Sequence, residues 1–127
     1  MLAFVLVTLG SAIGGLCRYL VSVLLTPRLS GSWPLATLLV NVVGCFVLSL
    51  VNETVLRGVP LRPSLRLLLT TGFCGGFTTY STFSLDAWRL ASGGQPGAAA
   101  AYVVATLLGG AAGTVAGLLL GARATLT

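Results

Sequence analysis

Residue types that could act on a solute gather in one short stretch of this sequence. Residues 72–84 (GFCGGFTTYSTFS) combine glycines, hydroxyl side chains and aromatic rings. Tyr80 and Phe83 are three positions apart, so they share one face of a helix. The positive edges of their rings could line an anion path without trapping the ion; alternatively, the rings could simply pack in a core. The hydroxyls around them belong to Thr79, Ser81, Thr82 and Ser84.

Two more polar side chains stand inside apolar segments. An unpaired Asn41 amide would be costly there. It could form an interhelical hydrogen bond or turn its NH₂ donor toward a pathway. Arg18 could reach back to the membrane interface, or it could stand at a vestibule and attract anions. Both pairs of alternatives remain open from the residues alone.

The composition excludes several classes of protein. Of 127 residues, 56% are hydrophobic and only 7% are charged, against about 25% charged in an ordinary soluble domain. Seven arginines, two acids (Glu53 and Asp86) and no histidine leave no general base or metal cluster for most hydrolytic enzymes. The net charge of +5 is too sparse for a nucleic-acid partner. We therefore expect a non-enzymatic protein of the lipid bilayer.

The apolar segments predict an all-α membrane protein with four transmembrane helices. A bilayer core takes about 20 apolar residues per helix, which leaves room only for short connections. The whole chain, 1–127, is then a single transmembrane domain. The expected spans are residues 2–25, 34–56, 64–90 and 98–122, joined by loops at 26–33, 57–63 and 91–97.

The third span is expected to be broken. Glycine costs about 1 kcal/mol relative to alanine in a helix, and threonine somewhat less, so Gly75-Gly76 followed by Thr78-Thr79 makes a poor continuous helix. At membrane depth, backbone that leaves a helix must be buried or line a polar cavity. The pattern predicts two half-helices that meet near residues 75–79. A flexible kink without a ligand is the alternative.

Glycines recur every four residues in the last span and lie on one helix face. Gly10 and Gly14 repeat this spacing in the first span. Such faces let helix backbones approach closely, either within one chain or between subunits. The stripe in the last span consists of Gly109, Gly113, Gly117 and Gly121.

The arginines divide almost evenly between the two ends of the spans. One end carries Arg57, Arg62, Arg66 and Arg123 with Glu53, and the other carries Arg18, Arg28 and Arg89 with Asp86. The positive-inside rule needs a clear asymmetry to fix orientation. The arginine count is thus equally compatible with two alternatives. The chain could insert in both orientations, which would permit an antiparallel homodimer, or it could insert in a single orientation set by the second loop.

The polar groups expected to be buried within the membrane are amides, hydroxyls, ring edges and one arginine, with no carboxylate. A coupled exporter of cations normally keeps an acid in the membrane. Because neither Glu53 nor Asp86 is well placed for that role, the inventory favours a small anion. A small dual-topology cation or drug exporter is the main alternative, but residues 2–25 hold no acid. A non-transporting subunit that packs through its glycines would not require the hydroxyl-rich break.

The motifs resemble those of the CrcB/Fluc fluoride channels over essentially the whole chain. Residues 72–84 are similar to the G-x-x-G-G-x-T-T-F-S-T-F motif of that family. Residues 37–46 (TLLVNVVGCF) are similar to its N-x-x-G-x-F motif, and residues 10–19 (GSAIGGLCRY) to its first-helix Gly/Arg motif. The chain departs from the family at Tyr80, where phenylalanine is usual. Smaller departures are Ser11, Ala36 and Ser49, where glycine is common.

The resemblance implies a dual-topology antiparallel homodimer in the inner (plasma) membrane, with two parallel pores that passively export fluoride and so lower its toxicity. It implies a structural Na⁺ at the dimer axis, held by the backbone carbonyls of Gly75 and Thr78 from both subunits. By motif position, the pore would contain the Asn41 amide and the Tyr80 and Phe83 rings, and Arg18 would stand near a vestibule. The implied polar track consists of Ser81, Thr82, Tyr102 and Thr106.

Overall fold

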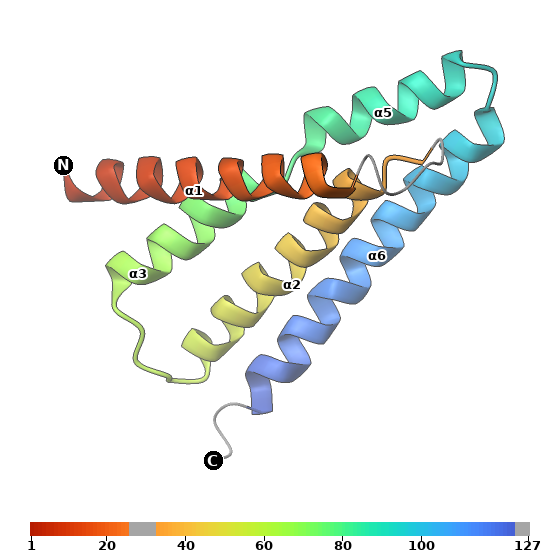
Figure 1. Ribbon diagram of the computed structural model, residues 1–127. Coiled ribbons are helices and arrows are strands. Elements are labelled where there is room, and N and C mark those ends of the chain that lie inside the picture. The colour runs from red at the N-terminus through yellow and green to blue at the C-terminus, as the bar shows by residue number, and fades with distance from the viewer. Residues whose placement is uncertain (26–32, 124–127) are drawn as a thin grey trace.

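The regular structure of the chain is entirely helical within the part that the structure describes. The computed structural model describes residues 1–25 and 33–123 (Figure 1). Arg28 and most of the expected first loop, residues 26–32, lie outside these ranges. The elements are α1 (Leu2–Leu25), α2 (Leu35–Leu56), α3 (Pro63–Leu67), the π-helix η1 (Leu68–Cys74), α4 (Gly75–Phe77), α5 (Tyr80–Ser92) and α6 (Pro96–Arg123).

Three of these helices, α1, α2 and α6, are long and apolar enough to cross a membrane. The all-helical class is confirmed for the described residues, and the three helices indicate a multi-pass membrane protein. The expected third span, residues 64–90, is divided among α3, η1, α4 and α5. None of these segments has the length of a full span, so this span stays a prediction.

The helix bounds lie within two residues of the expected ranges. The clearest difference is α6, which begins at Pro96 instead of residue 98. Proline suits the first position of a helix because the missing N–H would have no partner there. The first helical hydrogen bond runs from Ala99 N–H to the Gln95 carbonyl at 3.0 Å.

The two helices α2 and α6 run side by side along their length (Figure 1). The glycine stripe of α6 faces α2. A Cβ atom at Gly113 would lie 2.7 Å from the Val42 carbonyl oxygen, and one at Gly117 would collide with the carbonyl of Phe46. The stripe therefore packs within the chain, where it lets the two backbones touch.

The segments from α3 to α5 together form one interrupted helix, which we call the third helix. Helix α1 lies across its first half, against η1 and α4 (Figure 1). A Cβ atom at Gly10 would lie 2.5 Å from the Leu68 carbonyl oxygen, and one at Gly14 would collide with the carbonyl of Phe73. The two glycines of α1 thus allow its backbone to pack directly against the half-helix that precedes the break.

The third helix is interrupted at two residues within the expected range. Thr78 (φ −81°, ψ 161°) and Thr79 (φ −153°, ψ 116°) are both extended, and α5 begins at Tyr80. The π-helical turns of η1, just before the break, were not expected. A change from α-helical to π-helical hydrogen bonding cannot be recognised from hydropathy or composition. Such turns occur often at functional sites.

Replacing Gly14 with alanine should destabilise the protein, while the same change at Gly15 should not. A Cβ at Gly14 meets backbone atoms of Phe73 and Phe77, which cannot move cheaply, whereas one at Gly15 meets nothing within 4 Å. We expect Gly14→Ala to cost about 1–3 kcal/mol and Gly15→Ala to be neutral or slightly stabilising. Thermal unfolding in detergent measures both, and equal midpoints would contradict the packing described.

Candidate functional site

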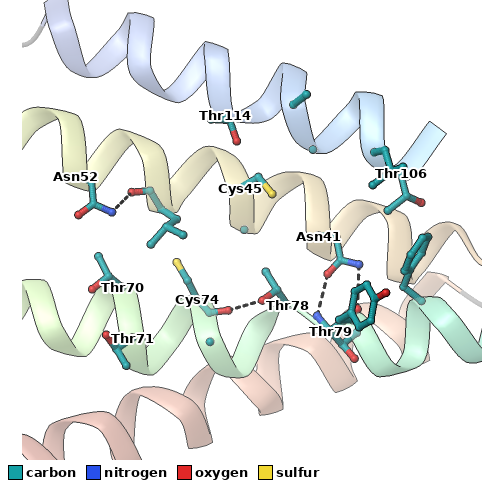
Figure 2. Close-up of a pocket in the computed structure, with 18 residues that line it drawn as sticks. Asn41, Cys45, Asn52, Thr70, Thr71, Cys74, Thr78, Thr79, Thr106 and Thr114 are labelled. Carbon is teal, nitrogen blue, oxygen red and sulfur yellow. Dashed lines mark hydrogen bonds between the residues drawn. The ribbon is translucent and has the colours of Figure 1, made fainter. Parts of the chain in front are cut away.

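The break in the third helix is held by the side chain of Asn41 from α2. The Thr79 N–H donates to Asn41 Oδ1 at 2.8 Å, and Asn41 Nδ2 donates to the Thr79 carbonyl at 3.1 Å (Figure 2). The amide therefore pairs with both backbone groups of one residue, as a neighbouring β-strand would. This is the interhelical hydrogen bond foreseen as one alternative. The NH₂ group has a second proton, so the pathway alternative remains open.

The Thr79 side chain starts the second half-helix. Its hydroxyl, on a buried residue, accepts from the Thr82 N–H at 3.2 Å and so caps α5. The same hydroxyl donates to Thr82 Oγ1 at 3.0 Å and lies 3.3 Å from Ser81 Oγ. Three of the four hydroxyls that the sequence singled out around the rings are thus joined in one small network at the start of α5, while Ser84 Oγ donates to the Tyr80 carbonyl at 3.0 Å.

Because of these contacts, two backbone carbonyls lose the N–H groups that would donate to them in a continuous helix. In a continuous helix, the Gly75 carbonyl would accept from the Thr79 N–H, and the Thr78 carbonyl from the Thr82 N–H. Here the first N–H donates to Asn41 and the second to the Thr79 hydroxyl. The two carbonyls that the family resemblance assigns to Na⁺ are thus released from those helical bonds.

An open groove of about 820 Å³ runs along the break between α2, the third helix and α6 (Figure 2). Among residues 1–25 and 33–123, no charged side chain lines it. Hydroxyl, amide, thiol and aromatic groups alternate along its wall with small and aliphatic side chains. The lining residues are Asn41, Gly44, Cys45, Leu48, Asn52, Thr70, Thr71, Cys74, Gly75, Thr78, Thr79, Tyr80, Phe83, Thr106, Leu107, Gly110, Ala111 and Thr114.

Aromatic rings continue from the edge of the groove into the interior. The ring centroids of Tyr80 and Phe83 lie 5.9 Å apart, and those of Phe83 and Tyr102 lie 5.5 Å apart. Tyr80 is 81% exposed, whereas Phe83 and Tyr102 are buried. The two expected pore aromatics therefore share a face but have different surroundings, with Tyr80 on the outer lip.

Two buried hydroxyls stand unpaired beside this row. Tyr102 Oη and Thr106 Oγ1 have no hydrogen-bond partner in the part of the chain that the structure describes. Buried polar atoms normally find one. Both groups can donate, so this region offers hydrogen bonds to a small acceptor that is not part of the chain.

Arg18 lies outside the groove, in a smaller hollow of about 290 Å³ that it shares with Thr37, Thr79 and Thr82. Thr79 lines both hollows, so the break forms part of the wall of each. Of the expected site residues, the groove brings together Asn41, Gly75, Thr78, Tyr80, Phe83 and Thr106. Ser81 lines neither hollow and reaches the site through the Thr79 hydroxyl.

Both acids of the chain are engaged elsewhere. Asp86 Oδ2 accepts from the Thr37 hydroxyl at 2.8 Å, and its other oxygen lies 3.9 Å from Arg89. Glu53 pairs with Arg57 at 2.6 Å. The groove wall is therefore free of carboxylates, which keeps its electrostatics favourable to an anion.

Sequence reasoning missed the other half of the groove, which is lined by Asn52, Thr70, Thr71 and Thr114. A spacing signal was present for two of them. Asn52 follows Asn41 by eleven residues, which is three helical turns, and Thr114 follows Thr106 by eight. The face of each helix was readable, but which faces meet depends on packing.

Comparisons with known proteins agree on one family. Residues 5–118 match the family model described as CrcB-like protein, Camphor Resistance (CrcB). A relative from Agrobacterium fabrum is 46% identical over 95% of this chain and 97% of its own length. Relatives from Rhizobium johnstonii (43%; 93% and 94%) and Chlorobium phaeobacteroides (42%; 85% and 83%) are similar. All three are named "Fluoride-specific ion channel FluC".

Removing the Asn41 amide should destabilise the break. Asn41→Leu leaves the Thr79 N–H and carbonyl without their partner, at about 1–3 kcal/mol for each buried group. Asn52→Leu is the matched control, because the side-chain bonds of Asn52 within the described ranges are to the Leu48 carbonyl in its own helix and to the exposed Arg66. Thermal unfolding in detergent should show the larger loss for Asn41→Leu. Equal losses of stability in the two variants would mean that the hydrogen bonds between Asn41 and Thr79 do not stabilise the break.

Proposed function

The chain belongs to the CrcB-like family, and on that premise we propose that it is a fluoride-selective channel that exports cytoplasmic fluoride by passive electrodiffusion. The relatives named as fluoride-specific channels support this directly, since they match most of the chain. The family consists of channels and not of enzymes. Lowering the toxicity of fluoride in the cytoplasm is then the role of the protein.

The observation that carries the proposal is the chemistry of the groove wall. Fluoride is small and strongly hydrated, so a narrow path must replace its water with hydrogen-bond donors. The groove offers the Asn41 amide and the Thr106 hydroxyl, and no carboxylate. Neutral donors bind an anion more weakly than a full positive charge would. Conduction requires such weak sites, because the ion must leave each of them again.

The residues divide into three parts along the proposed path. Arg18 and its hollow serve as a vestibule that attracts the anion. Asn41 offers its second N–H proton, and the ring edges of Tyr80 and Phe83 flank the ion. The hydroxyls then form the polar track, in which the unpaired groups of Tyr102 and Thr106 are the strongest candidates. The remaining members are Ser81 and Thr82.

We propose that a second copy of the chain, inserted upside down, completes the pore as an antiparallel homodimer. The groove is open on one side, and Tyr80 on its lip is 81% exposed. A polar groove facing lipid tails would be costly, whereas a second groove laid against it would enclose the path. The near-equal division of arginines between the two ends supports insertion in both orientations.

A structural Na⁺ at the axis of this dimer fits the residues at the break. Backbone carbonyls are hard oxygen ligands of the kind that alkali and alkaline-earth cations prefer. The Gly75 and Thr78 carbonyls are released from their helical donors. When bound, the cation would supply a fixed positive charge that offsets the cost of bringing an anion into a medium of low dielectric constant.

Export in this proposal needs neither a coupling ion nor ATP hydrolysis. A negative-inside potential across the inner (plasma) membrane favours outward movement of an anion by about 2.3 kcal/mol per 100 mV. The alternative, a small dual-topology cation or drug exporter, is disfavoured because α1 contains no acid. Both acids of the chain are also paired away from the groove.

Reconstituted protein tests the function. In liposomes with an imposed potential, we expect fluoride efflux far faster than chloride efflux. Asn41→Asp should abolish the fluoride flux, because the carboxylate repels the anion. It keeps the acceptor for the Thr79 N–H but loses the donor to the Thr79 carbonyl, so thermal unfolding in detergent must show that the variant is folded before its flux is compared. Gln95→Glu makes the same chemical change at an exposed position and should conduct normally. Equal or absent wild-type fluxes would overturn the proposed function.

Labelling tests the arrangement in the membrane. A chain with its three native cysteines replaced by alanine and a single cysteine at the exposed Ser92 should react with an impermeant thiol reagent in part from each side of the membrane. A cysteine at the exposed Arg62, at the opposite end of the spans, should also react in part from each side. Complete labelling of each position from one side only would contradict dual insertion.

A further inference from the structure

A second hollow adjoins the groove at the end away from Tyr80. It has a volume of about 470 Å³ and shares Asn52, Thr70 and Thr71 with the groove. Arg66 is the charged side chain in its wall. An ion that passes along the groove toward this end would therefore meet the Arg66 guanidinium at the mouth.

Arg66 is held in place by a neutral amide. Its Nη2 donates to Asn52 Oδ1 at 2.9 Å, which ties α3 to the last turns of α2. Asn52 in turn donates through Nδ2 to the Leu48 carbonyl at 3.0 Å, so its oxygen is fixed toward the guanidinium. One contact uses one of the five N–H donors of arginine, and the residue is exposed, which leaves donors facing water.

No side-chain carboxylate neutralises this charge in the part of the chain that the structure describes. Glu53 is the acid nearest in sequence to Asn52, but it pairs with Arg57 at 2.6 Å. Asp86, the other acid in the sequence, bonds Thr37 near the start of α2 and so lies at the far end of that helix from Asn52. An amide partner positions a guanidinium without cancelling its charge, so Arg66 keeps a full positive charge beside the groove.

We propose that Arg66, positioned by Asn52, is a capture site for small monovalent anions at this mouth of the groove. It acts by raising the local anion concentration and does not bind the ion tightly. The inference rests on the proposed function, since it assigns a second charged mouth to the same pathway, distinct from the hollow of Arg18. A cleft with one sign of fixed charge raises the arrival rate of the opposite ion, and salt screens this effect.

The test is the ionic-strength dependence of fluoride efflux from liposomes carrying variant proteins. At about 10 mM ionic strength, where the screening length is about 30 Å, Arg66→Gln should lower the rate about threefold. This is the effect of one unit charge on an ion about 7 Å away in water. Arg66→Glu should lower the rate further, and Arg66→Lys should restore most of it. At about 1 M inert salt, where the screening length is about 3 Å, the four proteins should conduct alike.

Arg62→Gln is the matched control. It removes the same charge one turn earlier, from an exposed residue that does not line the hollow, so its rate should change less than that of Arg66→Gln. Asn52→Leu should produce an intermediate loss, because the charge stays but is no longer held. A loss in Arg66→Gln that is equal at both ionic strengths, or no loss while the wild type conducts fluoride, would overturn the capture site. Absence of fluoride flux in the wild type would instead overturn the proposed function.

Discussion

The double hydrogen bond between Asn41 and the backbone of Thr79 is the interaction on which the rest of the site depends. A chain that leaves a helix at membrane depth must pair its N–H and carbonyl groups within the protein, and a single side chain from α2 does so for Thr79. Because this N–H is taken, the helix restarts at Tyr80 with the Thr79 hydroxyl as its cap. The new half-helix presents Phe83 to Tyr102, and the carbonyls before it are left for other ligands.

Close helix packing supplies the rigid frame around this break. Glycines on α1 touch the backbone of the first half-helix, and glycines on α6 touch the backbone of α2. Both contacts lie at distances that any side chain would prevent, so the frame depends on residues that carry no chemistry. With one face of α6 and one face of α2 committed to each other, polar residues on the adjoining faces line the groove. Its wall carries donors without fixed charge, and Arg18 and Arg66 stand in two neighbouring hollows.

Much of this arrangement was predictable from the sequence, for physical reasons that differ by residue. Glycine and threonine runs are poor helix formers, so the break near Thr78 and Thr79 was expected. An amide inside an apolar helix needs a partner, so Asn41 stood out, but its two bonds to one residue could not be foreseen because they depend on how α2 meets the third helix. The partner of the α6 glycine stripe, the π-helical turns of η1 and the part of the groove beside Asn52 and Thr114 were missed for the same reason. Each depends on the relative placement of helices and not on the properties of one segment.

Amide hydrogen exchange at Thr79 in the wild-type protein tests whether Asn41 holds the break. We expect the Thr79 N–H, although it lies at an interruption of the helix, to exchange as slowly as the amides inside the flanking half-helices, because it donates to Asn41 Oδ1 at 2.8 Å. Local openings with small free energies show as fast exchange. A Thr79 amide that exchanges as rapidly as those of the 57–62 connection would show that the Asn41 bridge does not hold, and the break would then be a flexible kink and not a structured site.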